Sequence, residues 1–230
     1  MSAYLKEVVY GGIDGIITTF AVVAGFSGAA LSNESTTQIS FLVVLLFGLA
    51  NLFADGVSMG LGNFLAVRSE QGLYNTLRAK EERDSLCNAD GEADETKRIL
   101  IQRGFSEEDA VTLTAIYKKN DPYWVDFLMS NELKMSDPTG ENAVYTGLVT
   151  FFAFVSFGSV PLVPFVVMGS FDPKTVFWFS TGGAGVALVI LGVLKWRIVG
   201  TGLLRSVGEI VLVGSVAASV AFFVGTLFTV

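Results

Sequence analysis

The chain has 230 residues, of which 51% are hydrophobic and only 16% are charged. Because soluble domains carry about 25% charged residues, this composition indicates that lipid surrounds much of the chain. There is no histidine and only one cysteine, which excludes an imidazole metal site, a histidine proton shuttle and an internal disulfide. The net charge of −7 argues against a nucleic-acid partner.

Five apolar stretches are long enough to cross a bilayer, which takes about 20 mostly apolar residues in a helix. Each stretch is far longer than a β-strand, so we expect an all-α polytopic membrane protein with five transmembrane helices. The expected spans are residues 8–31, 39–67, 143–169, 176–194 and 203–230.

Basic residues fall almost entirely on one side of these expected spans. If the N-terminus is cytoplasmic, then Lys6, Arg68 and the short loop with Lys195 and Arg205 are cytoplasmic, and the far side keeps only Lys174. Because cytoplasmic loops are enriched in Lys and Arg, we expect this orientation, with the C-terminus on the far side.

The segment 68–142 carries most of the charge of the chain. We expect it to form a cytoplasmic helical domain between two membrane parts, 1–67 and 143–230. The second membrane helix should continue past Arg68, because a single glycine is the only helix breaker over the next ten residues. Within this three-helix insertion we expect a turn at 88–91 and helices at 92–103, from the cap Ser106, and at 121–133.

Polar side chains inside the first two spans indicate an ion path. Asn51, Asp55 and Met59 lie at steps of four, which places them on one face of a helix, and the first span contributes Asp14. A charged side chain in a bilayer costs at least about 2.5 kcal/mol, so it needs a functional reason or a bonding partner inside the bundle. The combination of a carboxylate and a thioether favours a first-row transition metal over Ca²⁺ or Mg²⁺.

Acidic and thioether side chains recur at a spacing of three in the charged segment. A helix places such residues on the same face, so pairs on three helices can converge on divalent ions. Solvated acidic faces are the common alternative, and spacing alone favours that alternative. The pairs are Glu81 with Asp84, Glu92 with Glu95, and Met129 with Glu132.

Two motifs carry a resemblance to a known family. One is DGIITTFA at residues 14–21 of the first span, and the other is VSMGLGNFLA at residues 57–66 of the second. Together with NDPYWVDF at residues 120–127 and PLVPF at residues 161–165, they resemble the vacuolar iron transporter family, which includes the nodulin-like plant members. The resemblance covers nearly the whole chain, and the first two motifs together are specific.

The resemblance implies a transporter rather than an enzyme, without a prosthetic group. It implies a five-span protomer in a homodimer, whose ion path lies between the first two helices of each protomer. The implied activity is export of cytosolic Fe²⁺, and also of Mn²⁺, in exchange for protons. Asp14 and Met59 match the family's path residues, and we expect Asp55 beside them. The residues that fall on the family's cytoplasmic metal site are Glu81, Asp84, Glu92, Glu95, Met129 and Glu132.

Three positions depart from the family pattern. Leu128 replaces a second methionine next to Met129, and Asp84 replaces a glutamate. Asn51 replaces a glutamate that some members carry in the second helix, and Asp55, one turn further on, is a candidate to replace its charge. These departures bear on metal preference and on proton coupling.

Other classes of function remain open from the residues alone. A membrane di-iron oxidase is disfavoured because such sites combine carboxylates with histidine. A metal sensor needs no acidic group at membrane depth, so Asp14 and Asp55 argue against one. A Mn²⁺-selective transporter or an uncoupled divalent-metal channel fits the same residues. The expected location is the plasma membrane in a bacterium and the vacuolar membrane in a eukaryote.

Overall fold

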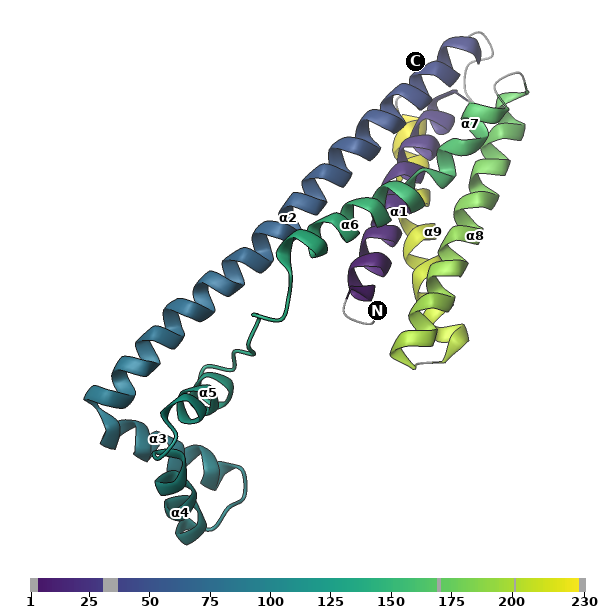
Figure 1. Ribbon diagram of the computed structural model, residues 1–230. Helices are drawn as coiled ribbons and strands as arrows, with labels where there is room; N and C mark the ends of the chain where they lie inside the picture. Colours follow the sequence, from purple (N-terminus) through teal and green to yellow (C-terminus); the bar gives the residue numbers. More distant parts are fainter. Residues whose placement is uncertain (1–3, 31–36, 169–170, 201, 228–230) are drawn as a thin grey trace. The chain divides into compact units, whose positions relative to one another are not determined.

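The computed structural model describes residues 4–30, 37–168, 171–200 and 202–227, and every regular element in these ranges is helical (Figure 1). The predicted all-α class is therefore confirmed for the described residues. Three expected span ends, Leu31, Gly169 and Val230, lie outside them. The elements are α1 (Leu5–Ala30), α2 (Thr37–Cys87), α3 (Ala89–Gln102), α4 (Glu107–Tyr117), α5 (Asp121–Asn131), α6 (Ala143–Gly158), the 3₁₀ helix η1 (Val160–Leu162), α7 (Val163–Val167), α8 (Pro173–Val199) and α9 (Leu203–Leu227).

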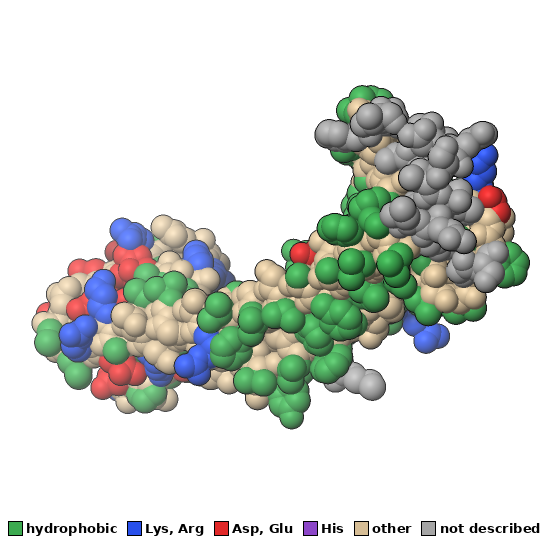
Figure 2. All heavy atoms as spheres, turned by 90° about the horizontal axis from the view of Figure 1, so that it is seen from above, with side chains coloured by type: hydrophobic (Ala, Val, Ile, Leu, Met, Phe, Trp, Pro, Cys, Tyr) green, Lys and Arg blue, Asp and Glu red, His purple; other side chains and the backbone are tan. Residues whose placement is uncertain are grey.

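The chain folds into two compact units. Unit 1 comprises Met1–Phe64 and Val144–Val230, and unit 2 comprises Leu65–Ala143. Figure 2 shows hydrophobic side chains spread over the surface of unit 1 and acidic and basic side chains gathered on unit 2. Unit 1 therefore presents the kind of surface that lipid solvates, and unit 2 the kind that water solvates.

Within the described ranges, five helical segments are long and apolar enough to cross a membrane, as the sequence predicted. The third of them is not the single helix that we expected, because α6 ends at Gly158 and is followed by η1 and α7. Pro161 lacks a backbone N–H and cannot continue an α-helical hydrogen-bond ladder. The Ser180 hydroxyl of α8 donates a buried hydrogen bond of 2.7 Å to the Pro161 carbonyl, which ties the break to its neighbour.

Helix α2 has 51 residues, which corresponds to a length of about 77 Å at 1.5 Å per residue. This confirms the prediction that the second membrane helix continues past Arg68. Asp55 is the only charged residue in its apolar part, residues 42–67, which is long enough to span a bilayer. The part that follows Val67 is rich in acidic and basic residues and therefore lies outside the membrane-spanning segment.

Glycines let the helices of unit 1 approach closely. A Cβ added to Gly60 of α2 would lie 2.9 Å from the Gly147 carbonyl oxygen of α6, and one added to Gly147 would lie 2.6 Å from the Gly60 carbonyl oxygen. A Cβ on Gly15 of α1 would collide with the backbone of Phe154. Because lipid provides no hydrophobic drive between helices, such close backbone packing is a main source of their association.

Unit 2 is built from the charged part of α2 and from α3, α4 and α5. Ser106 caps α4 by accepting a hydrogen bond from the Asp109 backbone N–H at 3.1 Å, as expected. The predicted turn at 88–91 is wrong, because α3 already begins at Ala89. Asp90 and Glu92 lie in its first turn, where the helix dipole favours acidic side chains, and this preference outweighs the turn signal of Gly91.

Candidate metal sites

Three carboxylates from three parts of unit 2 converge. They belong to Glu81 on α2, Glu92 on α3 and Glu132 just after α5. Each residue offers one carboxylate oxygen, and the three oxygens lie within 4.8 Å of one another. Glu81 is buried, with only 4% of its surface exposed, Glu92 is half-buried and Glu132 is exposed. Carboxylate oxygens bind divalent first-row metals at about 2.0–2.2 Å, so small side-chain rotations would bring all three onto one ion.

The electrostatics of this cluster suit a cation. Burial, and then the nearby charges of Glu132 and Glu92, raise the pKa of the Glu81 carboxyl to about 6. Burial and the charge of Glu132 likewise raise the pKa of Glu92, and loss of solvent together with the charge of Glu95 raises the pKa of Glu132. Carboxylates that repel one another at this range are stabilised in their charged form by a bound cation.

Asp84 and Glu95 lie close to this cluster but already have basic partners. The Asp84 carboxylate lies 3.9 Å from the Lys80 ammonium, and Glu95 pairs with Arg98 on the outside of α3. Both acids still act on the cluster, because their charges contribute to the raised pKa values of Glu92 and Glu132. The structure therefore places them as neighbours of the three converging carboxylates.

Met129 and Leu128 occupy the interior of unit 2. Met129 is fully buried in a hydrophobic cluster with Tyr74 and Val125. Leu128 is also fully buried and packs with Trp124 and Ala93. A leucine at the position of the family's second methionine thus contributes to core packing, which needs no sulfur.

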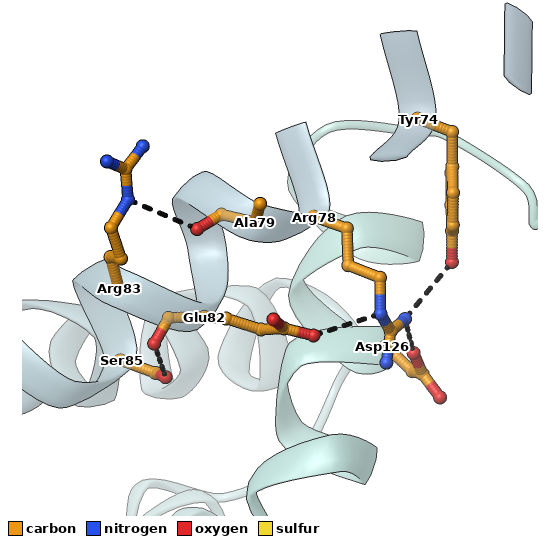
Figure 3. Close-up of polar contacts among 7 residues, drawn as sticks. All are labelled: Tyr74, Arg78, Ala79, Glu82, Arg83, Ser85 and Asp126. Atoms are coloured by element: carbon orange, nitrogen blue, oxygen red, sulfur yellow. Dashed lines mark hydrogen bonds and ion pairs between the residues drawn. The ribbon is translucent and has the colours of Figure 1, made fainter. Parts of the chain in front are cut away.

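An ion pair joins α5 to the charged part of α2. Arg78 donates to the Asp126 carboxylate of α5, to Glu82 at 3.2 Å and to the Tyr74 hydroxyl at 3.3 Å (Figure 3). Arg78 lies one turn before Glu81, and Asp126 lies on the helix that precedes Glu132. These contacts help to fix the helices from which two of the three cluster carboxylates project.

Buried packing holds α3 on α5. The Trp124 indole N–H donates a buried hydrogen bond of 2.8 Å to the Thr96 hydroxyl, which lies one turn after Glu92. The Lys118 ammonium lies 5.8 Å from the centroid of the Trp124 ring. The rigid neighbourhood of Trp124 therefore orients the α3 face that carries Glu92.

A second group of acids lies inside unit 1. Asp14 on α1 and Asp55 on α2 are both half-buried, and the two helices pack together in the cluster that contains Val23 and Leu52. The Asn51 amide donates a hydrogen bond of 2.7 Å to Asp55, whereas Asp14 accepts no side-chain hydrogen bond from the described residues. The Thr18 hydroxyl donates to the Asp14 backbone carbonyl at 2.8 Å and not to the carboxylate.

The polar face of α2 extends one step further than the residues singled out from the sequence. Met59 is half-buried and packs against the cluster that contains Leu52 and Phe154. Asn63, four residues on, donates a hydrogen bond of 2.7 Å to the Thr150 hydroxyl of α6. The same spacing of four that identified Asn51, Asp55 and Met59 would also have found Asn63.

Apolar spanning helices that carry acids at their contacts, and a charged unit with converging carboxylates, define a polytopic membrane protein with candidate cation sites. The family model described as VIT family matches residues 5–226. The chain belongs to this family.

Three relatives illustrate the similarity. The vacuolar iron transporter of Toxoplasma gondii is 34% identical over 98% of this chain and 74% of its own length. Vacuolar iron transporter 1 of Arabidopsis thaliana is 30% identical over 95% of this chain and 83% of its own. Vacuolar iron transporter 1 of Oryza sativa is 29% identical over 95% of this chain and 82% of its own length. Family membership and the five apolar helices together support an integral membrane protein.

Proposed function

We propose that this protein exports cytosolic Fe²⁺ across its membrane in exchange for protons, with Mn²⁺ as a second substrate. The observation that carries the proposal is the pair of acids Asp14 and Asp55, which are half-buried on two different apolar helices whose side chains pack in one hydrophobic cluster. Acids at membrane depth are typical of ion pathways. The names of the relatives, vacuolar iron transporters, support iron as the cargo.

Ion capture begins at the cluster of Glu81, Glu92 and Glu132. The ion binds the deprotonated carboxylates, so it displaces protons from groups whose pKa values are raised by their mutual charge. Asp84 and Glu95 add negative charge around the ion. Met129, buried next to the cluster helices, would have to turn out of its hydrophobic cluster to offer its sulfur as a ligand.

The ion then passes Asp14 and Met59 at a homodimer interface. In support of this path, Ala54 and Ser58 form an exposed row of small residues on α2, and this row adjoins the helix face that carries Met59. A second protomer packed on this row would bring two copies of Met59 toward each other. With no histidine in the chain, carboxylates carry the protons, and Asp14 and Asp55 are the candidates.

The orientation follows from the positive charges. The N-terminus and unit 2 are on the cytoplasmic side, because the Lys and Arg residues of the short loops lie there. The host membrane is the vacuolar membrane in a eukaryotic cell and the plasma membrane in a bacterium.

The test is uptake of divalent ions into vesicles that contain the purified protein, measured with and without a proton gradient. The proposal expects Fe²⁺ and Mn²⁺ uptake that a proton gradient accelerates, and no uptake of Ca²⁺ or Mg²⁺. Uptake that ignores the gradient would identify an uncoupled channel, and uptake of Mn²⁺ alone would identify a Mn²⁺-selective transporter. Binding without uptake would identify a sensor and contradict the proposal.

A further inference from the structure

Glu7 is a buried acid that the ion path described above does not include. It lies in the first turn of α1, and only 2% of its surface is exposed. Its Oε1 atom lies 3.6 Å from the Lys6 ammonium, but the Lys6 side chain is 80% exposed. Its Oε2 atom is buried and has no hydrogen-bond partner among the residues that the structure describes.

This arrangement needs an explanation, because a buried carboxylate oxygen without a partner is costly. An ion pair with an exposed lysine contributes about 0–1 kcal/mol and does not reach Oε2. The helix dipole favours an acid in the first turn of α1, but it does so equally well for an exposed one. Neither effect accounts for burial of the second oxygen.

The packing of α1 on α6 locates the Glu7 side chain. A Cβ added to Gly11 would lie 2.9 Å from the Thr150 carbonyl oxygen, and Gly15 packs on the backbone of Phe154, so the two helices run side by side in the same direction. One turn before Gly11 is Glu7, and one turn before Thr150 is Thr146.

Contacts on either side of Glu7 agree with this placement. The rings of Tyr4 and Tyr145 lie 6.4 Å apart, which puts the start of α1 beside the start of α6. Thr146 and Thr150 are both buried, and the Thr150 hydroxyl accepts the hydrogen bond from Asn63 of α2. Glu7 therefore lies beside a buried, oxygen-rich part of α6 that also contacts the polar face of α2.

Glu7 is also in register with the path. It precedes Asp14 by seven residues, which is two helical turns and about 10.5 Å along the axis of α1. Residues seven apart share a helix face. The order along this face is Glu7, Gly11 and Asp14, with the glycine at the point where the backbone of α6 comes closest.

We propose that Glu7 is a further cation-binding residue of the transport path, on the N-terminal side of Asp14. Its unpartnered Oε2 supplies a carboxylate ligand for the divalent ion between the start of α1 and Asp14. The inference rests on the proposed transport function and deepens it by adding a second ion position along α1.

The experiment compares Mn²⁺ uptake by vesicles that contain the full-length wild type, Glu7→Gln or Lys6→Gln. Glu7→Gln should raise the KM for Mn²⁺ by about tenfold, the change that about 1.4 kcal/mol of lost binding produces. Its Tm should be unchanged or higher, because a neutral amide replaces a poorly partnered buried acid. Lys6→Gln removes the ion pair but keeps the carboxylate, so its uptake should match the wild type.

The outcomes separate the possibilities. A Glu7→Gln variant with wild-type KM would overturn the inference while leaving the transport function intact. A loss of uptake that follows a loss of folded protein, or an equal loss in Lys6→Gln, would assign Glu7 a structural role and also overturn it. If wild-type vesicles take up no metal, the proposed function itself fails and this inference fails with it.

Discussion

The carboxylate of Glu81 gives the protein a specific dependence on pH. Its pKa is raised from 4.5 to about 6 in the folded protein, so between these values the folded state binds more protons than the unfolded state. The free energy of unfolding therefore falls as the pH rises. The stability contributed by this group is complete below pH 4.5 and is lost as the pH rises through about 6.

We predict that Glu81→Gln flattens this dependence. The wild-type, metal-free protein should lose more stability between pH 4.5 and 6 than the variant, because the variant has no carboxyl group to deprotonate at this position. Thermal unfolding of both proteins across this range measures the difference. Parallel curves for the two proteins would show that Glu81 titrates with the same pKa in the folded and unfolded states.

The cluster carboxylates should also differ from their neighbours in metal binding. Glu92→Ala removes one of the three converging carboxylates and should lower the affinity for Mn²⁺ by about tenfold or more, with slow transport remaining. Asp94→Ala, on the same helix but with its carboxylate paired to Lys97, is the matched control and should bind normally. Titration calorimetry measures both, and equal affinities would argue against the cluster as the site.

Sequence spacing identified the acids of unit 2 but not their division of roles. The i, i+3 pairs predicted which residues share a helix face, and Glu81 and Glu92 do meet. Spacing within one helix does not show which acid faces another helix. It therefore could not separate Glu92, which joins the cluster, from Glu95, which pairs with Arg98. The burial of Met129 depends on Tyr74, which is distant in sequence and was not predictable from the pattern.

Helix packing in unit 1 depends on where glycines face another backbone. Gly60 and Gly62 lie two residues apart on α2, but only Gly60 is in contact with α6, whereas nothing lies within 4 Å of a Cβ added to Gly62. The two positions thus allow the same substitution to be compared in the same helix.

We predict opposite effects of alanine at these two positions. Gly60→Ala forces α2 away from Gly147 and should destabilise the protein by about 1–3 kcal/mol, the usual cost of overpacking. Gly62→Ala should be neutral or stabilising by up to about 1 kcal/mol, because alanine favours the helix. Thermal unfolding in detergent measures the Tm of both variants. An equal change in Tm for the two variants would contradict the contact between Gly60 and Gly147.

The helices themselves were largely predictable, because length and apolarity decide them. The scarcity of helix breakers after Val67 predicted the continuation of α2, the cap at Ser106 predicted the start of α4, and the helix expected from residue 121 matches the start of α5. The break of the third span was missed although Pro161 was visible, since prolines are often tolerated in membrane helices. Only the structure shows that α6 ends before it.

For the protein as an assembly, the exposed row of small residues on α2 is the surface to test. Cys87 is the only cysteine of the chain and is exposed, so Cys87→Ser provides a background for single cysteines. In that background we predict that Ser58→Cys forms a cross-linked dimer in membranes, because the exposed Ser58 would lie at the interface between protomers. Val216→Cys, which is similarly exposed on α9, is the control and should remain monomeric. Cross-linking at both positions, or at neither, would contradict an interface on α2.

The account depends most on the acid at the contact between α1 and α2. The measurement is Fe²⁺ uptake by vesicles that contain equal amounts of folded wild-type or Asp14→Ala protein, checked by thermal unfolding. We predict uptake by the wild type, and none by Asp14→Ala although it is equally stable. Uptake that persists in Asp14→Ala, or is missing from the wild type, would contradict the proposed path.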